Sequence, residues 1–252
     1  MVGIYLSGTG NTKYCINKLV SALDKTAAVI PLESKDVISE IRKNDIIIIG
    51  YPTQYSNAPF MVRDFIKSNS ERWRDKKVLC VATMGAFSGD GAGCTARILK
   101  KYGAVILGGL HIRMPDSVCD SKLLKKTIEE NRQIVINADK KIEMTARKIK
   151  QGKYPSEGIS FISHIAGLLG QRLWFYGKTN GYSDKLKING DCTGCGLCSE
   201  ICPKGNISVK NGRAEADNKC TMCYRCISRC PRQAITLIGD KVQEQCRIEN
   251  YI

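Results

Sequence analysis

The sequence predicts an α/β protein: a doubly wound parallel sheet of five strands, followed by a small cysteine-rich α+β domain. Two observations lead to this prediction. Residues 1–118 alternate between short runs of Val, Ile and Leu and segments with helical periodicity. Residues 192–231 then hold eight of the 13 cysteines in two copies of one pattern. A chain of 252 residues, 43% of them hydrophobic, is long enough for two unequal domains.

The apolar runs are expected to be strands of a parallel sheet, because near-continuous apolarity suits strands that are buried on both faces. The strands are expected at residues 2–6, 27–32, 45–50, 77–83 and 104–112. Helices are expected at residues 11–24, 34–42, 58–70 and 93–102, with a long final helix at 121–150. This alternation implies right-handed crossovers, with helices on both faces of the sheet.

Residues 151–184 form a connector of different character, within which residues 159–176 have a helical pattern. The segment contains His164, Gln171 and Arg172, and it is too short and interrupted for a membrane span. A helix packed between the two domains is expected, with His164 as a hydrogen-bonded interface residue. Attachment to a membrane surface is the alternative, although such helices usually carry a strongly cationic polar face.

The cysteine pattern is Cys-x2-Cys-x2-Cys-x3-Cys-Pro, repeated at an offset of 28 residues. This spacing is typical of proteins with two 4Fe–4S clusters, in which the fourth cysteine of each copy binds the other cluster. Zinc is the alternative, but a zinc site calls for neither the third cysteine nor the Cys-Pro. The predicted ligand sets are Cys192, Cys195, Cys198 and Cys230 for one cluster, and Cys220, Cys223, Cys226 and Cys202 for the other.

The remaining five cysteines are scattered singly, and most of them are expected to be small buried hydrophobic residues. They are Cys15, Cys80, Cys94, Cys119 and Cys246. No export signal opens the sequence, so reduced thiols and a cytoplasmic location are expected.

A second motif follows the first expected strand and opens the first expected helix. Backbone N–H groups and a helix N-terminus at this point form a cradle for an anion, to which the side chains of Ser7, Thr9 and Thr12 add hydroxyl donors. The motif matches neither a Walker A loop nor a Gly-x-Gly-x-x-Gly fingerprint. Its position at the carboxyl end of a strand in an open α/β sheet favours a ligand site. The motif reads Ser7-Gly8-Thr9-Gly10-Asn11-Thr12.

Residues 1–150 resemble the flavodoxins, because residues 7–12 match the FMN phosphate loop of that family. The resemblance implies a flavodoxin-like strand order of 2-1-3-4-5, with FMN at the carboxyl edge of the sheet. It also implies that the loops after the third and fourth strands hold the isoalloxazine ring, with Tyr55 and Phe87 as candidates for stacking on it. The matching stretches are residues 51–57 and 83–90. Within them the expected cofactor-binding residues are Pro52, Thr53, Gln54 and Tyr55 in the first loop, and Met84, Gly85, Ala86, Phe87, Ser88 and Gly89 in the second.

Residues 185–240 resemble a two-cluster bacterial ferredoxin. The whole chain therefore resembles the flavodoxin–ferredoxin fusion proteins of anaerobic bacteria and archaea, which implies FMN and two 4Fe–4S clusters as cofactors. The expected organisation is an FMN-binding domain at 1–150, a connector with an interdomain helix at 151–184, and a ferredoxin domain with a C-terminal tail at 185–252.

The formal net charge of +15 departs from the family pattern, since flavodoxins and ferredoxins are usually acidic. An acidic redox protein, such as a ferredoxin or a client oxidoreductase, is therefore the expected partner. A solvated cationic surface is the alternative. The basic residues form no patch interleaved with aromatic residues, so neither nucleic-acid binding nor stable membrane insertion is expected.

The expected function is electron transfer between the two clusters and FMN in an anaerobic redox pathway. A ferredoxin-dependent reductase, which reduces a small organic substrate at FMN, is the alternative; a structural or nucleic-acid-binding role for the clusters ranks third. The sequence shows no Ser–His–Asp or paired-carboxylate constellation, and His111 and His164 are its only histidines. An open flavin edge would favour the reductase, and a covered edge would favour pure electron transfer.

Overall fold

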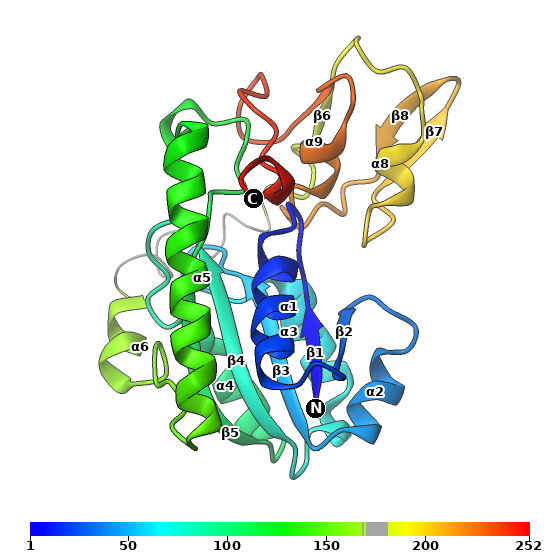
Figure 1. Ribbon diagram of the computed structural model, residues 1–252. Coiled ribbons are helices and arrows are strands. Elements are labelled where there is room, and N and C mark those ends of the chain that lie inside the picture. The colour runs from blue at the N-terminus through cyan, green and yellow to red at the C-terminus, as the bar shows by residue number, and fades with distance from the viewer. Residues whose placement is uncertain (168, 170–180) are drawn as a thin grey trace.

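The computed structural model describes residues 1–167, 169 and 181–252 of the chain. Its first part is a five-stranded parallel sheet in the order β2-β1-β3-β4-β5, as predicted (Figure 1). The strands are β1 (Val2–Tyr5), β2 (Ala28–Pro31), β3 (Ile46–Pro52), β4 (Lys77–Met84) and β5 (Val105–Arg113). The helices of this part are α1 (Asn11–Leu23), α2 (Val37–Lys43), α3 (Phe60–Ser68), α4 (Gly91–Lys101) and α5 (Ile128–Lys150), with short 3-10 turns at Ser70–Arg72 and Lys122–Leu124.

Helices cover both faces of the sheet, and each face has its own apolar core. In β3, Ile47 and Ile49 point to the core shared with α2, α3 and α4, whereas Ile48 points to the core shared with α1 and α5. This alternation is the normal pleat of a strand, in which successive side chains point to opposite faces. The sheet is therefore buried on both sides, which is why its strands are apolar throughout.

The long final helix begins later than predicted, at Ile128 instead of residue 121. The reason is a capping box: the Thr127 hydroxyl accepts from the backbone N–H of Glu130, and the Glu130 carboxylate accepts from the backbone N–H of Thr127. These bonds satisfy backbone donors at the start of the helix and fix its first residue.

The connector first runs along the outer edge of the sheet, where Ser156 forms a parallel bridge with Gly109 of β5. It continues into helix α6 (Phe161–Gly167), which lies against α4. The expected helix at 159–176 is thus described as far as Gly167, and Gln171 and Arg172 lie outside the described residues. No helix within the described ranges is long and apolar enough to cross a membrane.

The cysteine-rich part consists of two similar halves. Helix α8 and strand β7 in the first half begin 28 residues before α9 and β9 in the second, which is the offset of the sequence repeat. Strand β6 pairs with β9, and β7 pairs with β8, both antiparallel. The elements are β6 (Lys187–Ile188), α8 (Leu197–Glu200), β7 (Ile207–Lys210), β8 (Arg213–Ala216), α9 (Arg225–Arg229) and β9 (Ile235–Thr236), followed by a 3-10 turn at Ile248–Asn250.

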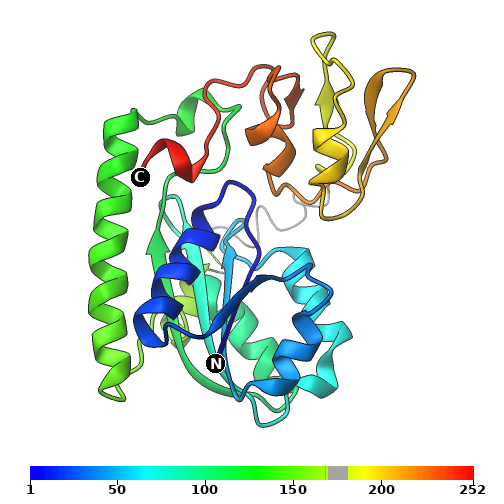
Figure 2. The same ribbon diagram turned by 45° about the vertical axis from the view of Figure 1, so that its right-hand side comes forward.

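This second part lies over the carboxyl ends of the sheet strands (Figures 1 and 2). Each part contributes a segment to the apolar core of the other. Cys119, in the loop after β5, belongs to the apolar core of the cysteine-rich part. In return, Ile248 and Tyr251 of the C-terminal tail pack with α1 and α5 in the core of the first part. The chain therefore folds as two interlocked units.

Asp120 fastens the two parts together. Its carboxylate is 3% exposed and accepts hydrogen bonds from the backbone N–H groups of Leu237 (2.6 Å), Ile238 (3.0 Å) and Gly239 (3.3 Å). The hydroxyl of Tyr224 donates to its other oxygen at 3.0 Å. Four donors thus compensate the desolvation of one buried carboxylate.

Replacing Asp120 by Asn should weaken the joint between the two parts by about 2–4 kcal/mol, because an amide nitrogen would face backbone donors. Thermal unfolding of the cofactor-loaded protein measures the loss. Asp240→Asn is the matched control, since Asp240 is exposed and pairs with Lys187 at the surface. Equal melting temperatures for the two variants would contradict this role of Asp120.

Candidate functional site

The predicted phosphate loop lies where β1 ends and α1 begins, and it is buried. The hydroxyl of Thr12 lies 2.8 Å from that of Thr83 at the end of β4, and the hydroxyl of Thr9 lies 3.1 Å from that of Ser117. The amide of Asn11 donates to the carbonyl oxygen of Pro115 at 2.7 Å. These contacts hold the loop between the ends of β4 and β5.

One buried hydroxyl of this loop, the Oγ of Ser7, has no hydrogen-bond partner among the residues that the structure describes. An orphaned buried donor is rare, and a ligand oxygen is a usual explanation for it. Ser7 lies in the same loop as the hydroxyls of Thr9 and Thr12 and just before α1, a helix of 13 residues. Hydroxyl donors and a helix N-terminus together fit a phosphate group. The residues present therefore fit the phosphate of FMN.

The two predicted ring loops also meet at the carboxyl edge of the sheet. The backbone N–H of Thr53 donates to the carbonyl oxygen of Thr83 at 2.8 Å, which joins the loop after β3 to the end of β4. Tyr55, in a left-handed conformation, is half-buried, and burial together with a hydrogen bond to Tyr182 raises its pKa to about 12. Phe87 in the other loop is 49% exposed. The two candidate stacking residues thus lie in different surroundings.

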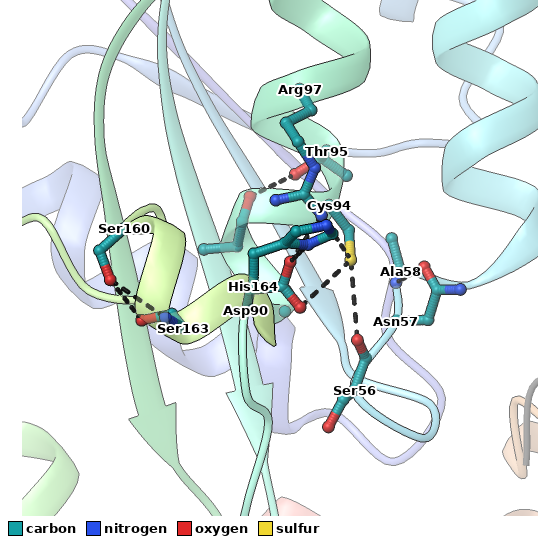
Figure 3. A network of polar contacts seen from close by, with 12 residues as sticks. Ser56, Asn57, Ala58, Asp90, Cys94, Thr95, Arg97, Ser160, Ser163 and His164 are labelled. Atoms are coloured by element: carbon teal, nitrogen blue, oxygen red, sulfur yellow. Dashed lines mark hydrogen bonds and ion pairs between the residues drawn. The ribbon is translucent and has the colours of Figure 1, made fainter. Parts of the chain in front are cut away.

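A buried polar network around Asp90 stabilises the loop after β4 (Figure 3). The fully buried carboxylate of Asp90 lies 2.9 Å from Nδ1 of His164 and 2.5 Å from the guanidinium of Arg97. His164 therefore forms its hydrogen bond where α6 packs against α4, a helix of the first part. A side chain on Gly89 would overlap the backbone of Gly167, so this position requires glycine.

His111 on β5 supports the same loop. Its ring lies 3.1 Å from the hydroxyl of Ser88, and it accepts a hydrogen bond from the backbone N–H of Ala92. Burial lowers the pKa of His111 below its ordinary value of 6.5, so the folded protein favours the neutral ring.

The predicted cluster ligands surround two separate cavities. Each cavity is lined by three cysteines of one motif and the fourth of the other motif, which is the crossed arrangement that the spacing predicts. In the described part of the chain, no three His, Cys, Asp or Glu side chains converge on a position for a single metal ion. We call the two cavities the distal cavity (Cys192, Cys195, Cys198 and Cys230) and the proximal cavity (Cys202, Cys220, Cys223 and Cys226).

Backbone N–H groups point at the cysteine sulfurs. Asn206 donates to Cys202 Sγ at 3.3 Å, and Ala234, the equivalent residue of the second half, donates to Cys230 Sγ at 3.4 Å. Such N–H···S bonds stabilise thiolates and tune the reduction potential of a cluster. The repeat thus gives the two sites matching hydrogen bonds.

The proximal cavity lies next to the predicted FMN site. A side chain on Gly8 would overlap the carbonyl oxygen of Cys223, so the phosphate loop touches the second cysteine motif directly. Arg225 spans the same contact: its guanidinium donates to the carbonyl oxygen of Ser7 at 2.9 Å and pairs with Glu33 at 2.5 Å. In addition, the amide of Gln54 donates to the carbonyl oxygen of Thr221 at 2.9 Å. Both the phosphate loop and a ring loop therefore contact residues 221–225.

Sequence reasoning placed Asp90 in the second ring loop without assigning it a role, and it did not find Asp120 or Arg225, although each has a structural role at these sites. Arg225 lies between two predicted ligands, Cys223 and Cys226, but the cysteine pattern does not indicate what an intervening residue touches. No local signal marks Asp120, because its partners come from distant segments. Asp90 pairs with the nearby Arg97, but its other partner, His164, lies in a distant segment.

The fold and these sites define a flavodoxin-like domain joined to an iron–sulfur domain, and comparison with known proteins supports both assignments. Residues 2–157 match the family model described as flavodoxin domain, so the chain belongs to the flavodoxin domain family. Residues 191–235 match the model described as 4Fe-4S dicluster domain. The chain is thus a flavodoxin–ferredoxin fusion, an iron–sulfur flavoprotein of electron transfer. No curated protein matches significantly.

Several solved structures are similar to the flavodoxin-like part. A flavodoxin from the domain Archaea is 16% identical and covers 59% of this chain and 97% of its own, with a TM-score of 0.43. Two-electron reduced flavodoxin from Megasphaera elsdenii is 26% identical; the match covers 46% of this chain and 89% of the flavodoxin, with a TM-score of 0.41. Oxidised flavodoxin 2 from Bacillus cereus is 21% identical; the match covers 60% of this chain and 97% of the flavodoxin, with a TM-score of 0.44.

Gly8→Ala should force the phosphate loop away from the second cysteine motif and destabilise the protein by about 1–3 kcal/mol, as overpacking of a tight contact usually does. The melting temperature and the FMN content of the purified protein measure the effect. Gly190→Ala is the control, because nothing lies within 4 Å of the added Cβ. Gly8→Ala behaving like Gly190→Ala would rule out the close contact.

His111 should make the protein less stable as the pH falls. Because its pKa is lowered in the folded state, the unfolded chain binds a proton below about pH 6.5 that the folded chain does not. The melting temperature should therefore drop between about pH 7.5 and pH 5.5, and the drop should be smaller in His111→Gln. Identical pH profiles for the two proteins would show that His111 does not contribute.

Proposed function

We propose that the protein takes single electrons from an acidic redox protein, such as a reduced ferredoxin of an anaerobic pathway. The electrons pass to the cluster in the distal cavity, then to the cluster in the proximal cavity, and finally to FMN. The observation that carries this order is the contact between Gly8 of the phosphate loop and Cys223 of the proximal cavity. A direct backbone contact is the shortest connection between a cluster site and the flavin site.

The entry point follows from exposure. Cys195 of the distal cavity is exposed, whereas Cys223, its equivalent in the proximal cavity, is half-buried; each cavity also has one buried cysteine, Cys198 or Cys226. The exposed side chain of Arg232 lines the distal cavity, and that of Arg213 lies near Cys192 of the same cavity. An acidic partner would be attracted to this end of the molecule, and the net charge of +15 favours such a partner overall.

The residues of the phosphate loop bind and orient FMN in this proposal. The hydroxyls of Ser7, Thr9 and Thr12 would hold its phosphate, while the loops that contain Tyr55 and Phe87 would flank its ring. FMN supplies the ability to exchange either one or two electrons, so the fusion would convert single electrons into pairs. Arg225 would fix the loop against the proximal cavity through its bonds to Ser7 and Glu33.

A ferredoxin-dependent reductase that acts on a small organic substrate is the second candidate. One observation favours it: Phe87 and its neighbour Ala86 are exposed, so the loop after β4 leaves part of the predicted ring site open. Substrate turnover with reduced ferredoxin, compared with FMN reduction alone, distinguishes the two functions.

The test compares the protein with a Cys195→Ser variant. The anaerobically purified protein should hold about eight iron, about eight sulfide and about one FMN. In the variant, FMN reduction by a reduced ferredoxin should slow by about tenfold or more, since the exposed cluster loses a ligand. Reduction of FMN by light and a small donor, which bypasses the clusters, should be unchanged.

Ser199→Ala is the control for the substitution itself, because Ser199 lies between Cys198 and Cys202 of the same motif and is not a predicted ligand. Zinc without sulfide in the purified protein would contradict the cluster assignment. Unchanged ferredoxin-driven reduction in a Cys195→Ser variant that has lost its distal cluster would contradict the proposed order.

A further inference from the structure

Two cysteines outside the cluster sites meet at the junction of the two parts. Cys119 lies in the loop after β5, and Cys246 lies in the C-terminal tail. The side chains of the two residues line the same small cavity, and the backbone N–H of Gln243 donates to the carbonyl oxygen of Cys119 at 2.9 Å. Neither cysteine belongs to the predicted ligand sets, and Cys246 is partly exposed whereas Cys119 is buried.

The surroundings of this pair favour the thiolate form of Cys119. Hydrogen bonds from the side chain and backbone N–H of Cys246 lower the pKa of Cys119, while the pKa of Cys246 is raised because it holds the shared proton. The isolated Cys15 differs, since burial raises the pKa of its thiol. A small cavity lined by both cysteines, Lys125 and Lys126 opens beside the pair. The same cavity is also lined by Asp116 and Glu244, so the lowered pKa of Cys119 comes from its hydrogen bonds and not from a cationic setting. A thiolate beside a partly exposed partner thiol is a usual setting for thiol–disulfide exchange.

The tail that carries Cys246 also covers the phosphate loop. Two residues beyond Cys246, the backbone N–H of Ile248 donates to the carbonyl oxygen of Thr9 at 3.0 Å. A Cβ on Gly10 would lie 2.5 Å from the Ile248 side chain. A covalent bond at Cys246 would therefore hold the tail against the loop that is predicted to bind FMN.

We propose that Cys119 and Cys246 form a dithiol–disulfide site that closes by exchange with a low-molecular-weight disulfide and fastens the C-terminal tail over the phosphate loop. The Cys119 thiolate takes the proton of Cys246, so that Cys246, the more accessible sulfur, attacks the external disulfide as a thiolate. The sulfur that leaves takes up a proton from solvent and becomes one free thiol. Cys119 then attacks the mixed disulfide at the Cys246 sulfur and releases the second thiol. The two cysteines lose their shared proton and two electrons, and with the proton from solvent these convert the external disulfide into two thiols. A reducing dithiol reverses the reaction.

The experiment treats the cluster-loaded protein anaerobically with oxidised glutathione and maps its peptides after alkylation. A Cys119–Cys246 disulfide is expected, with the visible absorbance of the clusters unchanged. The amide of Ile248 should then exchange its hydrogen with solvent about tenfold more slowly, because the closed disulfide restricts opening of the tail. This readout requires no FMN, so it stands apart from the proposed electron route.

The variants separate the pair from the other thiols. Cys119→Ser and Cys246→Ser should each abolish the disulfide and the change in exchange. Cys80→Ala, which removes a buried thiol of β4, should retain both. Glutathione attached singly to Cys246, or no modification of either cysteine while the clusters remain intact, would overturn the dithiol site. A disulfide that leaves the exchange of Ile248 unchanged would overturn its action on the tail.

Discussion

The position of the iron–sulfur part depends on one buried carboxylate, that of Asp120. A carboxylate with 3% exposure is costly unless donors surround it, and here three backbone N–H groups and the hydroxyl of Tyr224 do so. These donors come from the second half of the cysteine repeat, whereas Asp120 follows the last strand of the sheet. The bond set therefore selects one orientation, in which the second cysteine motif faces the carboxyl edge of the sheet.

That orientation explains the arrangement of the candidate sites. The motif around Cys223 lies on the phosphate loop, and Arg225 and Gln54 add hydrogen bonds across the same interface. The distal cavity is consequently left at the exposed end of the molecule. The C-terminal tail closes the structure from the other side, where Ile248 bonds to Thr9. The proposed entry point for electrons, the proposed relay and the predicted flavin site are thus arranged by the way the two parts are docked.

The sequence was sufficient for the features that repeat or alternate. The apolar runs predicted five buried strands, and the flavodoxin resemblance predicted their order. The cysteine spacing predicted crossed ligand sets, whose members line the two cavities. The start of α5 was predicted too early, although Thr127 and Glu130 form a capping box that is visible in the sequence. The docking of the two parts was not predictable, because the Asp120 and Arg225 bonds join segments about 100 or more residues apart and leave no local pattern.

The most direct measurement is an anaerobic crystal structure of the cofactor-loaded protein, with the iron atoms located by anomalous scattering. The account predicts FMN phosphate within residues 7–12, and a nearest cluster that is bound by Cys202, Cys220, Cys223 and Cys226. A flavin closest to the cluster of Cys192, Cys195, Cys198 and Cys230, or zinc in the two cavities, would contradict it.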